Sequence, residues 1–185
     1  MKKLCSVLPL FLLVMNVYSQ QERIVKFGVK AGVAFAALKQ DYVDNSSSSN
    51  SVMKPGLIFG GFANIAISKS IFFQPSILYV SKRYDYYNRN HYLEIPLNIL
   101  YKAQTKRGIF LTGGGVSPAF ILNNYYGNQI KQFDLGVNVL VGYQLPIGFS
   151  INLGYTYGLL NLSSNKSYIS KIQNKYFSLT AGYEF

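Results

Sequence analysis

The chain has 185 residues, with 18 Lys or Arg against 7 Asp or Glu, so its formal net charge at neutral pH is +11. Charged residues make up only 14% of the chain, whereas Tyr, Phe and Gly are frequent, with 16, 13 and 16 residues. This length suits one domain, and the composition favours β-structure over helices. The basic residues are scattered, which argues against the clustered patch that nucleic-acid binding requires.

The first twenty residues, MKKLCSVLPLFLLVMNVYSQ, differ from the rest of the chain. Lys2 and Lys3 precede a short apolar run, and Ser19 offers a small residue before Gln20. This layout is typical of a secretory signal peptide, and the run is too short to span a bilayer as a helix. We therefore predict a signal peptide at 1–19 and a mature domain at 20–185. A buried N-terminal helix is the less favoured alternative.

Cysteine and charge usage describe the mature chain further. Cys5 is the only cysteine and lies within the predicted signal peptide, so we expect neither a disulfide nor thiol chemistry. It precedes the apolar run, too early for a lipoprotein attachment site. Removal of Lys2 and Lys3 leaves 16 basic and 7 acidic residues, a net charge of +9. Many of these basic residues border apolar segments, where phosphates of anionic head groups or lipopolysaccharide would lie.

After residue 24, segments of about ten residues alternate apolar with small or polar side chains, which is the period of a β-strand. The alternation is clearest at 91–102, where Leu93 and Leu97 oppose Glu94, and it is blurred by glycines and Pro118 in the following segment. We predict eight strands, at 25–36, 56–67, 71–82, 91–102, 108–121, 132–144, 149–160 and 175–185.

The connections between these segments alternate in length. Long polar connections at 37–55, 83–90, 122–131 and 161–174 alternate with shorter ones around 68–70, 103–107 and 145–148. This order is expected when every other turn lies on the same side of a membrane.

The two faces of the strands decide the predicted class of fold. One face is large and aliphatic with aromatic residues toward its ends, and the other carries Gly, Ser, Asn, Thr and a few charges. A sheet in lipid must close on itself, and segments of this length suit a tilted crossing. We predict an all-β fold, an eight-stranded antiparallel up-and-down transmembrane β-barrel with its termini in the periplasm. A soluble lipocalin-like carrier of a small ligand is the alternative.

The last segment, KYFSLTAGYEF, places apolar residues at every second position up to Phe185. A terminus usually frays unless it is tied down. Pairing of this strand with the first would hold it and close the cylinder. Alternating apolar residues that end in Phe also look like the C-terminal signal that is read by outer-membrane assembly machinery.

Several stretches together resemble the small Gram-negative barrels known as the porin family or outer membrane protein beta-barrel domain family. The most specific is YLEIPLNILYK (92–102), and the others are KPGLIFGGFANI (54–65), FFQPSILYVSKRY (72–84), GGGVSPAFIL (113–122) and FDLGVNVLVGYQL (133–145). Their order and spacing match over nearly the whole mature chain. The resemblance implies an outer-membrane location and does not imply an enzymatic activity.

The sequence offers little for catalysis. His91 is the single histidine, and the carboxylates are scattered rather than grouped as metal ligands. Ser81 or Asp85 near His91 could be imagined as a hydrolytic pair, but a surface histidine is the favoured interpretation. We therefore predict no enzymatic activity, cofactor or metal.

The charges on the polar face would lie inside the barrel, which makes them the main candidate site. They are Lys26, Lys30, Lys82, Glu94, Lys102, Asp134 and Glu184. An eight-stranded barrel has an interior just filled by side chains, and buried charges must be paired. We predict salt bridges between Lys82 and Glu94 and between Lys26 and Glu184. A polar core that fixes the register is favoured over a gate or a narrow polar path.

The outer loops form the second candidate site. Their candidate contact residues are Tyr86, Tyr87, Arg89, Tyr125 and Tyr126, which could bind a host, phage or matrix partner or could lie among head groups. The sequence thus predicts a non-enzymatic outer-membrane barrel, structural or narrow porin-like, with surface recognition as the alternative. Its expected partners are the lipid bilayer, lipopolysaccharide and the assembly machinery that reads the strand ending at Phe185. We expect a monomer that does not bind nucleic acid.

Overall fold

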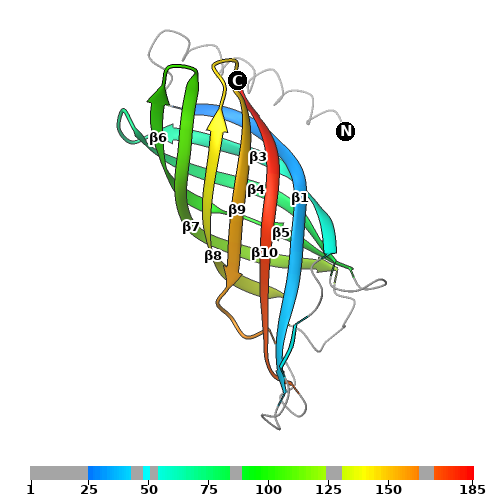
Figure 1. Ribbon diagram of the computed structural model, residues 1–185. Coiled ribbons are helices and arrows are strands. Elements are labelled where there is room, and N and C mark those ends of the chain that lie inside the picture. The colour runs from blue at the N-terminus through cyan, green and yellow to red at the C-terminus, as the bar shows by residue number, and fades with distance from the viewer. Residues whose placement is uncertain (1–24, 43–47, 51–53, 84–88, 124–130, 163–168) are drawn as a thin grey trace, which may run out of the picture.

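The chain forms a closed antiparallel β-barrel (Figure 1). The computed structural model describes residues 25–42, 48–50, 54–83, 89–123, 131–162 and 169–185, and for 38–42, 48–50 and 169–172 it describes the backbone alone. All regular structure within these ranges is strand. Within the same ranges there is no helix with the length and apolar character to cross a bilayer.

Ten stretches of strand lie within the described residues. They are β1 (Val25–Tyr42), β2 (Ser48–Asn50), β3 (Lys54–Ala66), β4 (Ile71–Arg83), β5 (Arg89–Glu94), β6 (Leu97–Thr105), β7 (Gly108–Asn123), β8 (Phe133–Gln144), β9 (Phe149–Gly158) and β10 (Ile169–Glu184). β5 and β6 together form one strand of the barrel, because both pair with β4 on one side and with β7 on the other. β2 pairs with β1 outside the barrel wall. The barrel therefore has eight strands, as predicted.

The last strand closes the barrel. β10 pairs with β9 on one side and with β1 on the other, in a register that sets Gly28 opposite Glu184. At the very end, the backbone N–H of Phe185 donates to the carbonyl oxygen of Phe27 at 2.9 Å. The predicted closure by the C-terminal strand is confirmed.

The two ends of the barrel differ in their connections. Short turns at 67–70, 106–107 and 145–148 lie where β1 begins and β10 ends, and we call this the terminal end. The strand ends that border the longer connections lie at the opposite end of the barrel, which we call the loop end. The turn at 145–148 requires its glycine, because Gly148 has a φ of +89° and a Cβ there would lie 2.3 Å from the carbonyl oxygen of Glu184.

β1 and β10 are longer than the sequence indicates. β3 stops pairing with β1 at Ala36, and β9 stops pairing with β10 at Lys175. Beyond these points, residues 38–42 pair with residues in 169–174, and β2 adds a third strand. We call residues 38–42, 48–50 and 169–174 the arm, and Figure 1 shows it projecting from the loop end. The prediction missed it because these stretches lack an apolar alternation.

The predicted strand at 91–102 is interrupted at Ile95 and Pro96. Proline has no N–H to donate, so a regular ladder cannot continue through it. Its neighbours compensate, since the N–H of Ser76 donates to the carbonyl oxygen of Pro96 and the N–H of Ile95 to that of Pro118, both at 2.9 Å. The interruption therefore disturbs the wall only locally.

The wall is apolar outside and largely polar inside. Large aliphatic side chains in mid-strand face outward, and Val139 and Leu153 are 60% and 57% exposed. Asn98, Ser117 and Thr180 are among the buried polar side chains. A soluble carrier would show the reverse, with its aliphatic side chains within the barrel.

Candidate functional site

A buried ion pair lies in the half of the lumen nearest the loop end. Lys82 Nζ on β4 lies 2.6 Å from Glu94 Oε1 on β5, and their side chains are only 2% and 1% exposed. Glu94 Oε2 accepts hydrogen bonds from Tyr176 Oη at 2.6 Å and from Ser117 Oγ at 3.4 Å. Lys82 Nζ also lies over the rings of Tyr92 and Tyr176, 4.1 and 4.5 Å from their centroids. The charges are thus compensated by cation–π contacts and hydrogen bonds as well as by each other.

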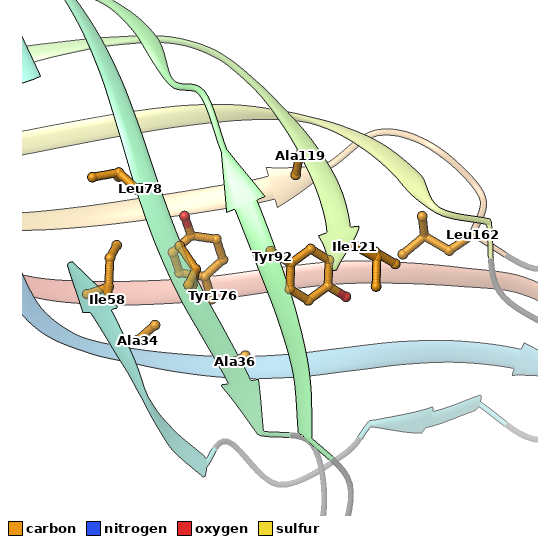
Figure 2. Close-up of a cluster of buried hydrophobic side chains, with 10 residues drawn as sticks. Ala34, Ala36, Ile58, Leu78, Tyr92, Ala119, Ile121, Leu162 and Tyr176 are labelled. Carbon is orange, nitrogen blue, oxygen red and sulfur yellow. The ribbon is translucent and has the colours of Figure 1, made fainter. Parts of the chain in front are cut away.

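An apolar cluster surrounds this ion pair and fills the same half of the lumen. Figure 2 shows its side chains pointing inward from several strands, with the rings of Tyr92 and Tyr176 among them. Its members are Ala34, Ala36, Ile58, Leu78, Val80, Tyr92, Ala119, Ile121, Leu162 and Tyr176. We call this cluster, together with Lys82 and Glu94, the lumen plug. Sequence reasoning missed it because isolated apolar residues on the polar face carry no periodic signal.

A second group of charges lies at the terminal end. Glu184 Oε2 is 3.0 Å from Lys102 Nζ, and Glu184 Oε1 is 3.6 Å from Lys26 Nζ. The amide of Asn64 also donates to Glu184, and Gln74 Nε2 donates to Asn64 Oδ1 at 2.9 Å. Lys26 lies at the rim with 52% of its side chain exposed. Glu184 therefore joins Lys102 as well as the predicted Lys26, and the Lys102 contact is the shorter one.

The two remaining lumen charges occupy different levels. Lys30 lies between the two groups, where its Nζ donates to Ser76 Oγ at 3.2 Å and lies 5.4 Å from the ring centroid of Phe62. Asp134 is buried beside the plug. It shares a cross-strand row with Glu94, with only Ala119 between them. Two carboxylates, Glu94 and Asp134, thus lie close to Lys82 in this part of the lumen.

A cavity separates the plug from the terminal charges. The space within it that the centre of a water molecule can occupy is about 70 Å³. Lys30, Asn98, Asn138 and Lys102 contribute to its walls, and Tyr176 of the plug bounds it toward the loop end. The walls also include apolar residues such as Phe62 and Leu100, so polar and apolar groups share the lining, and several water molecules fit beside the polar groups.

The predicted loop contacts are described only in part. Arg89 is exposed at the start of β5, near the loop end. Tyr86, Tyr87, Tyr125 and Tyr126 lie outside the described residues, as does the predicted signal peptide.

His91 takes part in an aromatic stack on the outer surface. Its ring lies 5.6 Å from that of Tyr79, which lies 4.9 Å from that of Phe59. The Tyr79 hydroxyl and His91 Nδ1 form a hydrogen bond of 2.5 Å. Ser81 is the cross-strand neighbour of His91, but their side chains form no hydrogen bond in the described part of the chain. Asp85 lies outside that part, and within it no three potential metal ligands are grouped.

Three solved structures that are similar to this chain are compared with it in turn. Neisserial surface protein A has a TM-score of 0.53 at 16% identity, with 86% of this chain and 97% of that chain covered. The outer membrane enzyme PagL has a TM-score of 0.53 at 10% identity, with 81% and 98% covered. Ail of Yersinia pestis has a TM-score of 0.48 at 14% identity, with 86% and 98% covered. The first two share the barrel fold with this chain.

Comparison of the sequence itself with known proteins and families adds to this likeness of fold. No curated protein matches the chain. The family model described as outer membrane protein beta-barrel domain matches residues 5–185. This match agrees with the closed barrel, its apolar outer wall and its polar interior, which together suit a protein embedded in a lipid bilayer. The chain therefore belongs to the outer membrane protein beta-barrel domain family.

Proposed function

We propose that this protein is a non-enzymatic integral outer-membrane barrel with a structural role, and that its lumen does not conduct ions. The observation that carries the proposal is the lumen plug. Lys82 and Glu94 are almost completely buried, and the apolar cluster fills the space around them. A conducting pore needs a continuous wet path lined by polar groups. An ion that crossed this barrel would have to displace both the aromatic rings and the ion pair.

Its placement in the cell follows from the same features. Residues 1–19 would be removed during export, and the terminal end would face the periplasm with the arm outside the cell. The outward aliphatic side chains would contact lipid, and rim lysines and arginines would meet lipopolysaccharide phosphates. The assembly machinery would read β10, which ends beside the 60% exposed Phe185. A closed barrel has no free edge in the membrane, so a monomer suffices.

Conductance in planar bilayers tests the closed lumen. We expect no steady current from the wild-type barrel, because the plug blocks the water path. We expect the same from Glu94→Gln and from Lys82→Met, since Tyr92 and Tyr176 still fill the lumen in both variants. The measurement is single-channel recording at symmetric salt, with a general porin as the positive control.

The same recording separates the two kinds of membrane role. A steady wild-type current that changes in Glu94→Gln would contradict the structural proposal and favour a narrow pore. Only preparations with heat-modifiable gel mobility, a sign of a folded barrel, should be compared.

Surface recognition is a second candidate, and the arm is the observation that favours it. The arm continues the sheet past the last barrel pairings, Ala36 with Lys54 and Lys175 with Tyr157. Closing the barrel does not need these additional residue pairs. An extended β-structure beyond the membrane could present loops or a strand edge to another macromolecule.

Deletion of the part of the arm that belongs to β1 and β2 tests recognition. Residues 39–51 would be replaced by Asn-Gly, a sequence suited to a tight hairpin turn. We expect the barrel to keep its heat-modifiable mobility, because the pairs from Gly28 to Ala36 remain. Under the recognition hypothesis, bacteria carrying the variant lose adhesion to immobilised fibronectin, laminin or collagen. Equal adhesion by wild type and variant would leave only the structural role.

A further inference from the structure

The lumen charges are unevenly distributed along the barrel axis. Lys82, Glu94 and Asp134 lie together at the plug, and these three side chains have a formal net charge of −1. Nearer the terminal end, the lumen charges of the described residues are Lys26, Lys30, Lys102 and Glu184, which have a formal net charge of +2. The cavity lies in this positive half, so its walls favour an anion.

Lys30 is the lysine that this imbalance leaves without a counter-charge. Lys26 and Lys102 both lie within 4 Å of Glu184, and Lys82 lies that close to Glu94. Lys30 takes part in none of the ion pairs of the described residues. Its Nζ contacts the neutral Oγ of Ser76 and the face of the Phe62 ring. An ammonium group away from bulk water requires an opposite charge or hydrogen-bond acceptors. Lys30 lines the cavity, so a group bound within the cavity can supply the missing charge or acceptor.

Two other groups in the cavity wall also require a partner. Asn98 Oδ1 and Asn138 Oδ1 are buried and accept no hydrogen bond from the described residues. Both residues line the cavity. A buried carbonyl oxygen without a donor is costly, and ordered water usually supplies one. The walls therefore require both a negative charge and hydrogen-bond donors.

We propose that this cavity binds a small monovalent anion such as chloride, held at Lys30 and solvated by water molecules that donate to Asn98 and Asn138. Its volume of about 70 Å³, open to the centres of water molecules, suits one such ion with a few waters. The plug closes the route from the loop end. The half-exposed Lys26 marks the terminal end as the entrance and would attract anions to it. This goes beyond the proposed function, because a closed lumen can hold an anion without conducting it.

Chloride-35 NMR tests the site, with chloride itself as the probe. The folded barrel in zwitterionic detergent should broaden the chloride line, and added bromide should narrow it by competition. Lys30→Met should weaken chloride binding at least about tenfold, because it removes the closest charge from a poorly screened position. The matched control is Lys69→Met, which removes an exposed lysine from the turn at 67–70. It should bind chloride like the wild type.

A variant that is expected to strengthen chloride binding keeps the test independent of simple loss of function. Glu184→Gln removes the competing carboxylate of the positive half, so it should tighten chloride binding several-fold. Only variants with heat-modifiable mobility would be compared. Equal broadening by Lys30→Met and Lys69→Met would overturn the proposal, as would wild-type broadening no greater than that of detergent alone. Weaker binding in folded Glu184→Gln would overturn it too.

Discussion

Glu94→Gln lowers the free energy of unfolding by about 3–5 kcal/mol, the expected cost of removing one partner of a buried ion pair. Lys82 Nζ would lose the carboxylate 2.6 Å away while its side chain stayed buried. The rings of Tyr92 and Tyr176 would remain over the ammonium group. They do not offset the lost charge, because both cation–π contacts are already present in the wild type. Tyr176 would also lose a charged acceptor for its hydroxyl group.

Urea titration in lipid vesicles, followed by heat-modifiable mobility, measures this effect. The control is the double variant Lys82→Met with Glu94→Leu, which should recover most of the lost stability because no unpaired charge remains. Arg89→Gln, at the exposed start of β5, should change the free energy of unfolding by less than about 0.5 kcal/mol. A loss below about 1 kcal/mol in Glu94→Gln would show that the ion pair does not hold the barrel together.

Leu153→Arg lowers the free energy of unfolding by about 2–4 kcal/mol, the cost of an arginine on the lipid-facing surface near the bilayer midplane. Leu153 lies in the middle of β9 and is 57% exposed. Its cross-strand neighbours are Val141 and Leu179, which are also exposed and apolar. The guanidinium group would therefore have to reach the head groups past other aliphatic side chains.

The matched control is Ile147→Arg, in the turn at 145–148. Ile147 is 70% exposed, and its place at the terminal end should bring an arginine to the interface, where the cost is about 0–1 kcal/mol. Both variants would be unfolded with urea in the same vesicles. Equal stabilities of the two variants would be incompatible with a membrane contact at Leu153.

Much of the wall was predictable because a transmembrane strand leaves a period of two in the sequence. Leu153 shows it plainly between Asn152 and Gly154, and Val139 follows the polar Asn138. The short turns and the closure by the strand ending at Phe185 followed from the same pattern. The charges on the polar face could be placed within the lumen, because a charge in mid-strand has no other low-cost position.

Other features depend on contacts between segments that are distant in sequence. The arm forms because β1 and β10 continue to pair, although neither segment shows an amphipathic alternation there. Tyr176 lies on the polar face of its strand, and its role became visible only once its hydroxyl was seen to donate to Glu94, 82 residues away. The second partner of Glu184 was missed for the same reason, since sequence spacing does not reveal which strands meet across a lumen.

The seam between β1 and β10 also has a consequence for the order of events in assembly. It joins the first described strand to the last one, with Gly28 beside Glu184, so it is the pairing with the greatest separation along the chain. Contacts of this kind form late, because a long loop must be closed before they give any stabilisation. Until then the growing sheet keeps two free edges that can pair with other chains. Protection of those edges is therefore most important in the interval before the final strand arrives.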